Sequence, residues 1–361
     1  MLIRPLLLAE AFINPQALLV LPLKQWDLLI RQARRANMLA KLAFLLEDHN
    51  ILQAIPDAPR KHLISAQIHA KRFAASIEWE ITCIARALQN EPVKLILLKG
   101  AAYYAAGNLA ANGRIFSDVD ILVPENTLLA VEQALAKAGW MNLSFDAYEQ
   151  KYYRQWMHEI PPLRHLKRQT SLDVHHNILP KTAKFCPDAA SLLNNAVQVK
   201  HKNSWVLSTE DRVIHSATHL FYEGELEQGF RDVSDLDFLL KEFSESHNFW
   251  QQLLQRATDL KQQLPLYYAL RYCRKIFATP IPEEIQRQVE RYTSNPLKRI
   301  LMDALFLRAL MPDHPSCDDR WTGLARWLLY IRSHWLRMPM HLLIPHLLRK
   351  SWMRLTGKEL H

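Results

Sequence analysis

The stretch that decides the fold is LILLKGAAYYAAGNLAANGRIFSDVDILV, residues 95–123. Its first four residues, 95–98, are all apolar and predict a short strand that ends at Lys99-Gly100. A segment compatible with a helix follows, and a second predicted strand then carries Asp118 and Asp120. Because alternate side chains of a strand point to the same face, we expect the two carboxylates side by side, opposite the glycine turn.

A third carboxylate lies in the segment TSLDVH, residues 170–175, where polar and apolar residues alternate. This alternation predicts another short strand, with Asp173 and His175 on one face. Mg²⁺ prefers oxygen ligands and is usually bound by one or two carboxylates together with substrate phosphates. Two metal ions that clamp the attacking and leaving oxygens of an in-line displacement at phosphorus need about three such acidic groups. The pattern therefore favours a magnesium site for phosphoryl chemistry.

The order of these segments is strand, glycine turn, helix, Asp-x-Asp strand and a later strand that bears an aspartate. It resembles the order in the nucleotidyltransferase superfamily that includes DNA polymerase β. More narrowly, residues 97–101 (LLKGA), 114–123 (RIFSDVDILV) and 172–175 (LDVH) look like a bacterial family of uncharacterised nucleotidyltransferases. The resemblance covers roughly residues 90–240. It implies an NTP substrate and catalytic ligands for Mg²⁺ or Mn²⁺, namely Asp118, Asp120 and Asp173.

The glycine turn is the predicted phosphate contact. The ammonium of Lys99 would meet the triphosphate of the NTP as a point charge, although a lysine at a strand end can also simply reach solvent. The backbone N–H groups of Gly100 and Ala101 would cradle a phosphate at the start of the following helix. The superfamily most often has Gly-Ser or Gly-Gly at this turn, so Ala101 is a departure that removes a hydroxyl.

Two residues just before the Asp-x-Asp pair are further candidates for nucleotide binding. Arg114 could reach a γ-phosphate or neutralise charge in the transition state, and pairing with a surface acid is an equally good interpretation. Ser117 would cap or orient Asp118. A later charged segment is expected to serve only in helix capping and surface pairing: Arg231, Asp232 and Asp235.

Three histidines have more than one interpretation. His175 could contact the acceptor or support Asp173, but a structural role is at least as good an interpretation. His215 and His219 are four residues apart on a predicted helix, with Asp211 one turn earlier, so all three share a face that could bind a ligand. Without a further motif, core or surface histidines are the preferred interpretation.

The composition indicates a globular, mostly helical protein. Of the 361 residues, 49% are hydrophobic and 22% are charged, and only 8 are glycine, too few for a protein rich in tight β-turns. We therefore expect an α+β fold, in which a small mixed β-sheet core has extensive helical N- and C-terminal flanks. Four regions are predicted: a helical N-terminal region (1–90), the nucleotidyltransferase α/β core (91–180), a helical domain packed on the core (181–310) and a basic, Trp-rich helical C-terminus (311–361).

Hydrophobic periodicity predicts the helices of both flanks. Apolar residues recur at three- and four-residue spacings over 23–46 and 60–88. Between 140 and 168 the chain is aromatic and basic, and no strand or helix is predicted there. Other helices are expected at 127–138, 211–222, 232–243, 249–260, 265–277 and 296–310.

The cysteines and the apolar runs indicate the cellular compartment in which the protein is expected. The four cysteines are dispersed, with no C-x-x-C pair, so they predict free thiols in a reducing compartment and no zinc site. The N-terminus has no signal-peptide pattern, and no run of about 18 apolar residues occurs. We therefore expect a cytoplasmic protein without a transmembrane segment, which could still associate peripherally with a membrane.

The net charge of +9 is concentrated near the C-terminus. Between residues 321 and 361 the arginines and lysines are interleaved with Trp and Leu, and Glu359 is the single acidic residue. Such a basic amphipathic segment can bind an anionic membrane surface or single-stranded nucleic acid. A helical hairpin packed on the protein, with cationic outer faces, is slightly preferred.

Together with the resemblance, these features predict a Mg²⁺-dependent nucleotidyltransferase. It would move an NMP from an NTP, such as ATP, to a hydroxyl acceptor and release pyrophosphate, and the acceptor would be a small molecule, a polymer or a protein. Two alternatives remain open. One is a non-catalytic nucleotide-binding regulator, for which Ala101 is the one hint. The other is a protein that binds a membrane or a polyanion through its basic C-terminus.

Overall fold

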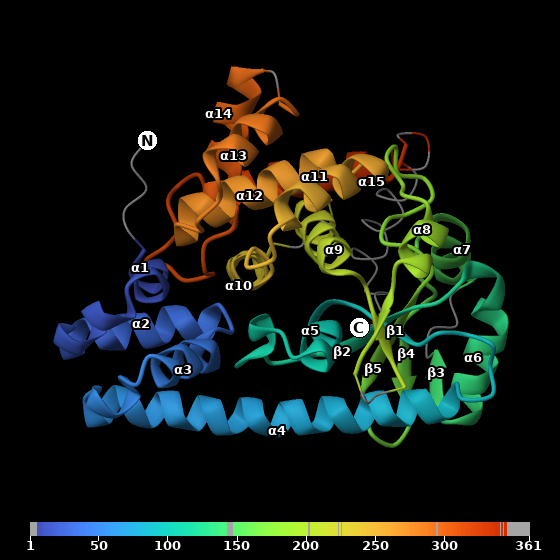
Figure 1. The fold of residues 1–361 in the computed structure, drawn as a ribbon, viewed down its shortest axis with the longest axis horizontal. Helices are drawn as coiled ribbons and strands as arrows, with labels where there is room; N and C mark the ends of the chain where they lie inside the picture. The colour runs from blue at the N-terminus through green and yellow to red at the C-terminus, as the bar shows by residue number, and fades with distance from the viewer. Residues whose placement is uncertain are drawn as a thin grey trace.

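The fold class is α+β, as predicted, with one mixed sheet between two sets of helices (Figure 1). One large hydrophobic core runs from the N-terminal helices through the sheet to the C-terminal helices, and a small second cluster contains Leu179, Ala183 and Tyr222. The computed structural model of the protein describes residues 6–142, 147–200, 203–222, 224, 226–293, 295–339, 341 and 343–344.

Seven short strands form the sheet, in the order β3-β4-β5-β2-β1-β7-β6. The central strands β1, β2 and β5 are the three that the sequence predicts. The strands are β1 (Ile96–Leu97), β2 (Asp118–Leu122), β3 (Trp140–Asn142), β4 (Leu163–His165), β5 (Ser171–His175), β6 (Val197–Gln198) and β7 (Trp205–Val206).

The pairing of the central strands sets the position of the aspartates. Strand β1 runs antiparallel to β2, and β5 runs parallel to β2 on its other side. In this register Asp120 is directly opposite Asp173. Because neighbouring residues in register point to the same face of a sheet, the two carboxylates emerge side by side. The alternate residues Val119 and Val174 are fully buried on the opposite face.

Helices account for most of the remaining described residues. Four precede the sheet: α1 (Leu7–Ile13), α2 (Leu23–Arg35), α3 (Leu39–Asp48) and α4 (Asp57–Ala87). Four are interspersed with the strands: α5 (Lys99–Ala106), α6 (Leu128–Lys137), α7 (Ala147–Trp156) and α8 (Ala189–Asn194). Seven follow: α9 (Thr209–Tyr222), α10 (Gly229–Phe243), α11 (Phe249–Asp259), α12 (Gln263–Phe277), α13 (Glu283–Glu290), α14 (Pro296–Ala309) and α15 (Thr322–Arg337).

The helix expected over 23–46 is in fact two helices, α2 and α3, joined by a turn at residues 36–38. Asn37 in this turn has a φ of 52°, in the left-handed region. Asparagine adopts this conformation more readily than most residues because its short polar side chain can hydrogen-bond locally. The apolar periodicity continues through the turn, so the spacing alone does not reveal the break.

The 31-residue helix α4 runs along one side of the molecule, from the N-terminal helices to the sheet (Figure 1). Its buried Glu80 accepts two hydrogen bonds from Arg168, at 2.8 and 3.0 Å, and one from the hydroxyl of Thr170, at 2.6 Å. The Arg168 guanidinium also stacks on the ring of Trp140, 4.8 Å from its centroid. These contacts fix the β4–β5 turn, and thereby the strand that carries Asp173, to α4.

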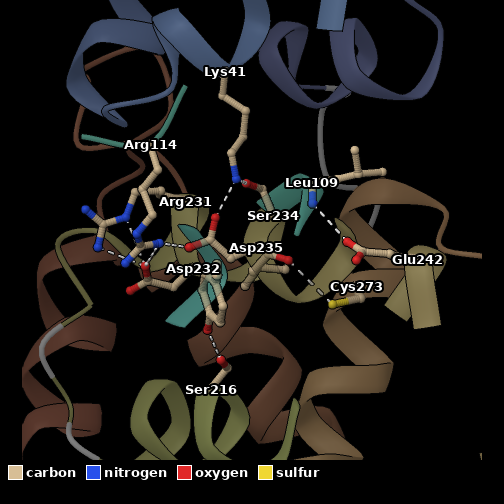
Figure 2. A network of polar contacts seen from close by, with 12 residues as sticks. Lys41, Leu109, Arg114, Ser216, Arg231, Asp232, Ser234, Asp235, Glu242 and Cys273 are labelled. Carbon is tan, nitrogen blue, oxygen red and sulfur yellow. Dashed lines mark hydrogen bonds and ion pairs between the residues drawn. The ribbon is translucent and has the colours of Figure 1, made fainter. Parts of the chain in front are cut away.

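A buried ion network joins the N-terminal helices to the C-terminal ones (Figure 2). Lys41 of α3 pairs with Asp235 of α10, and both side chains are at most 3% exposed. Arg114, in the loop before β2, pairs with the same Asp235 and lies 3.7 Å from Asp232. The expectation of helix capping and surface pairing for Asp235 is therefore wrong, because this carboxylate is a buried counterion for two cations.

The loop that contains Arg114 also packs closely on α3. Gly113 has a φ of +72°, and a Cβ atom there would overlap the backbone of Lys41. Only glycine avoids both the strained conformation and the overlap at this position. The loop that leads into β2 is thus fixed to the N-terminal helices by backbone contact as well as by charge.

Helix α15 packs on α14 and α9, but its outer face is not the cationic surface that we expected, and the hairpin predicted for the C-terminal run extends beyond the described residues. Its inner face is buried, and Arg332 is part of the packing, since it donates to the carbonyl of Phe221 at 2.8 Å. The outward-facing side chains are instead large and apolar: Trp321, Leu324, Trp327, Leu328, Ile331 and Trp335. Arg326 and Arg337 are partly buried, and four further basic residues of this segment lie outside the described residues: Arg349, Lys350, Arg354 and Lys358.

Among the described residues, no helix combines sufficient length with sufficient apolar character to cross a membrane.

The buried network predicts a large stability effect for a conservative change. Asp235→Asn should lower the free energy of unfolding by about 3–5 kcal/mol, because it leaves Lys41 and Arg114 without their shared counterion. Chemical denaturation would measure this loss. The matched control is Asp27→Asn, which removes the carboxylate of the exposed pair between Arg31 and Asp27 and should cost at most about 1 kcal/mol. Equal losses in the two variants would contradict this role of Asp235.

Candidate metal and nucleotide site

The three predicted aspartates meet at one place on the sheet. Asp118 and Asp120 come from β2 and Asp173 from β5, and one carboxylate oxygen of each lies within 4.8 Å of the others. The convergence follows from the parallel, in-register pairing of the two strands. Three oxygens at this spacing can share one or two divalent cations.

Asp120 is the most buried of the three, at 3% exposed. Two groups contact its Oδ1 atom: the ammonium of Lys99 donates to it at 2.8 Å, and Nε2 of His175 lies 3.0 Å away. Burial opposes ionisation of this carboxyl, but Lys99 and the hydrogen bond with His175 outweigh it and hold the pKa of Asp120 well below its usual range. The Asp120 carboxyl is therefore charged at neutral pH.

Asp173 is in the opposite electrostatic situation. Burial, followed by the charges of Asp120 and Glu159, raises the pKa of Asp173 to about 7. Its Oδ1 atom is buried and has no hydrogen-bond partner among the described residues. A carboxylate that lacks both a proton donor and a cation is destabilised, and a metal ion beside it would relieve this.

Asp118 lies at the more accessible end of the cluster. It is only partly buried, and the hydroxyl of Ser117 donates to its Oδ1 atom at 2.9 Å. Ser117 thus contacts the first aspartate directly, which agrees with the orienting role expected for it.

The glycine turn forms the first turn of α5, beside Asp120. The backbone N–H of Leu98 donates to the Asp120 carbonyl at 2.9 Å, so α5 begins next to the aspartates. Lys99 has a φ of 45°, a strained conformation for a non-glycine residue, and such strain is often found at functional sites. The first N–H groups of a helix have no partner within the helix, which makes this end of α5 suited to an anion.

Close packing accounts for the residues at the turn. A Cβ atom on Gly100 would lie 2.8 Å from Nε of Arg114 and 2.8 Å from the Phe116 ring, so only glycine fits. The methyl group of Ala101 is almost fully buried. The side chain at this position therefore faces the protein interior, while its backbone belongs to the helix N-terminus.

Arg114 belongs to the buried network of Figure 2. Its guanidinium pairs with Asp235 and lies 5.7 Å from the ring centroid of Tyr103. Burial, followed by the nearby Arg231, lowers the pKa of Arg114. Of the two interpretations from the sequence, pairing with an acid is the one that the structure has, although this acid is buried and not at the surface.

The histidines of α9 lie near the site without joining a metal cluster in the described part of the chain. His215 is buried, and burial, followed by the charge of Lys99, lowers its pKa well below the usual value. The His219 ring is 6.5 Å from it. Asp211, one turn earlier, is fully buried and pairs with Arg256, at 2.7 Å. Instead of sharing a face that binds a ligand, His215 belongs to the protein core and Asp211 is the counterion of Arg256.

Two functional candidates escaped the sequence analysis: His158 and Glu159. They lie between α7 and β4, in the region that shows no clear period. Glu159 forms an isolated antiparallel bridge with His175 of β5, and its carboxylate is 3.3 Å from Nδ1 of that histidine. Burial opposes protonation of His175, but Glu159 and the hydrogen bond with Asp120 raise its pKa.

Comparison with known proteins gives one match. Residues 22–278 match the family described as uncharacterised nucleotidyltransferase. No curated protein and no solved structure matches the chain. The match extends on both sides beyond residues 90–240, where the sequence motifs lie, and so includes the helices α2 to α4 and α10 to α12. Because it covers more than half of the chain, this protein belongs to that family of nucleotidyltransferases.

Proposed function

We propose that the protein transfers an NMP from an NTP to a hydroxyl group and releases pyrophosphate, in a reaction that depends on Mg²⁺ or Mn²⁺. The observation that carries the proposal is the convergence of Asp118, Asp120 and Asp173 beside the N-terminus of α5, in a member of a nucleotidyltransferase family. Carboxylates and a helix N-terminus are the groups that a metal–triphosphate complex requires.

The donor set fits the proposed metal. All three ligands offer oxygen, which Mg²⁺ prefers, and the buried Oδ1 atom of Asp173 has no hydrogen-bond partner among the described residues. Burial, followed by the negative charges of Asp120 and Glu159, raises the pKa of Asp173, and a cation at the cluster would offset both effects. Asp118, Asp120 and Asp173 would hold the metal, which would supply Lewis-acid activation of the α-phosphate and charge neutralisation.

The other residues would bind and orient the substrates. Lys99 would pair with a phosphate, because its ammonium is within reach of both the metal ligands and the first turn of α5. The N–H groups of Gly100 and Ala101 would hold the phosphates in line. Asp173 would help to activate the acceptor hydroxyl, through the metal that it holds or as the base that takes the proton. Arg114 would act mainly by positioning the loop before β2, through Asp235.

The acceptor is proposed as a class: a small molecule, a polymer or a protein that offers a hydroxyl, in the cytoplasm. Three aligned carboxylates support turnover over a purely regulatory role, since nucleotide binding alone requires neither a shared metal site nor a carboxylate with a raised pKa. Incubation with each NTP radiolabelled at the α-phosphate, Mg²⁺ and a cell extract would test the activity and reveal the labelled acceptor.

The substitution Asp173→Asn separates activity from stability. It should lower label transfer by about 10²–10³-fold, as loss of one charge-stabilising group typically does. Without Mg²⁺, its thermal midpoint should equal or exceed that of the wild type, because the amide replaces a buried charge that has no counterion. Asp48→Asn, on the exposed end of α3, is the matched control and should change neither property. Full transfer by Asp173→Asn would remove this residue from the proposed site.

The role of Lys99 can be tested by its effect on nucleotide affinity. Lys99→Ala should weaken Mg²⁺-dependent NTP binding by about 10–100-fold, since a charge-assisted hydrogen bond to phosphate contributes about 1.5–3 kcal/mol. Calorimetry would measure the affinity, and circular dichroism would verify the fold. Lys94→Ala, on an exposed lysine five residues earlier, is the control. If the two variants bind the NTP with the same affinity as the wild type, Lys99 does not contact the nucleotide.

The outer face of α15 favours a second function, association with an anionic membrane surface. Six large apolar side chains, three of them Trp, lie on this face, and Trp327 and Trp335 are 57% and 68% exposed. Large exposed apolar patches mark interaction sites, and Trp on a basic amphipathic helix suits the membrane interface. The net charge of +9 would add electrostatic attraction to anionic lipid. This association would place the enzyme near its acceptor without taking part in the chemistry.

Sedimentation with vesicles would test this second function. The double variant Trp327→Gln/Trp335→Gln should bind phosphatidylserine-containing vesicles at least about tenfold more weakly, because two aromatic side chains no longer enter the interface. The control is Trp79→Gln, on a similarly exposed residue of α4. Transfer to a soluble acceptor should be unchanged in both. Equal sedimentation of the double variant and the wild type would exclude the α15 face as the membrane contact.

A further inference from the structure

A second group of side chains that could hold a metal ion lies next to the aspartates, since His175 contacts Asp120. His158, Glu159 and His175 each offer one ligand atom, and these atoms lie within 4.8 Å of one another. Both histidines are buried, and their ring centroids are 5.3 Å apart. The group shares no residue with the three aspartates.

The backbone holds these side chains in place. Glu159 and His175 are directly opposite each other in an antiparallel bridge, so their side chains leave the same face. The N–H of His176 donates to the carbonyl of His158 at 2.8 Å, and the N–H of Ile160 donates to the carbonyl of Val174 at 3.0 Å. The segment 158–160 is thereby attached to the end of β5. A site in which the backbone fixes the ligands loses little entropy when a metal binds.

We propose that His158, Glu159 and His175 bind a divalent transition-metal ion, with Zn²⁺ as the preferred ion. Two imidazole nitrogens and one carboxylate oxygen are the ligand set of many three-ligand zinc sites, and imidazole suits zinc and its neighbours better than magnesium. Mg²⁺ requires oxygen ligands and is selected by the aspartate cluster instead. The aspartate cluster would thus bind hard cations such as Mg²⁺, and the group of His158, Glu159 and His175 would bind borderline cations such as Zn²⁺.

The hydrogen bond between His175 and Asp120 supports this inference. Nδ1 of His175 faces Glu159 and is the atom available to the metal, while Nε2 lies 3.0 Å from Asp120. Histidines that bind metals typically donate their other N–H to a carboxylate, which fixes the tautomer and the ring orientation. Asp120 provides this carboxylate. A metal on Nδ1 would in turn keep a proton on Nε2 and hold Asp120 in position.

The site has one partly exposed ligand, and its three side chains would leave an open position on the metal. The Glu159 side chain is 18% exposed, whereas the two histidines are buried. Three protein ligands leave a fourth position of a tetrahedral ion for water or another ligand. The inference does not depend on the proposed transfer reaction, because it concerns metal binding alone.

Cobalt(II) is the probe for this site, because its visible absorption reports nitrogen ligation and low coordination number. The full-length protein, free of tags and stripped of metal, should give visible bands with about one equivalent of Co²⁺. Zn²⁺ should abolish the bands, and a large excess of Mg²⁺ should not. His158→Ala and Glu159→Gln should lower the Zn²⁺ affinity by more than the ~10–100-fold that loss of an outer-shell partner costs.

Two comparisons make the result decisive. Asp118→Asn removes a ligand of the aspartate cluster and should leave the Co²⁺ bands unchanged. Circular dichroism of Glu159→Gln, which preserves the shape of the side chain, verifies that loss of the bands is not loss of fold. The inference is overturned if the wild type gives no bands, if both His158→Ala and Glu159→Gln retain them, or if Asp118→Asn loses them.

Discussion

The burial of Asp120 is the constraint on which the rest of the site depends. A carboxylate withdrawn from water is costly by several kcal/mol unless cations and hydrogen-bond donors lie against it. Here the start of α5 supplies Lys99 and the end of β5 supplies His175, both in contact with the same oxygen.

The positions of Lys99 and His175 both follow from the topology of the sheet. Strand β1 must run antiparallel to β2 for α5 to begin beside Asp120, and β5 must run parallel to β2 for His175 to lie two residues beyond the partner of Asp120. The order and direction of the strands therefore determine which charges surround Asp120.

The local sequence pattern was sufficient to predict the strands that carry the aspartates, but it did not reveal the elements and side chains that lie around them. The alternation over residues 171–175 and the apolar run before Lys99 are direct consequences of strand geometry, so β1, β2 and β5 could be predicted. Strands β3 and β4 could not, because residues 140–168 combine aromatic and basic side chains without a period of two. Glu159 was missed for the same reason, since its position depends on a bridge to β5 that no neighbouring residue signals. The exposed apolar face of α15 was also missed, because periodicity identifies an apolar face and does not tell which of two such faces is covered.

Charge pairs between distant segments were the other part that the sequence could not reveal. Lys41, Arg114 and Asp235 look like ordinary surface residues of helices and loops, and only the packing of α3 against α10 makes them a buried group. The family match over residues 22–278 includes all of these segments, so the helices on both sides of the sheet belong to the unit that the family shares. The sheet presents the aspartates, and the helices supply the counterions that hold the intervening loop.

The contact between Lys41 and Asp235 has a consequence for the order in which the protein forms. The two residues are 194 positions apart, and chains emerge from the ribosome N-terminus first. While the N-terminal helices and the strands β1, β2 and β5 are being made, Lys41 and Arg114 have no carboxylate from α10 to pair with. Until α10 has been synthesised, the loop that leads into Asp118 can pack on α3 only through its backbone contact at Gly113 and lacks its counterion Asp235. Nascent chains that end before α10 would thus carry all three aspartates but lack the carboxylate that neutralises Lys41 and Arg114.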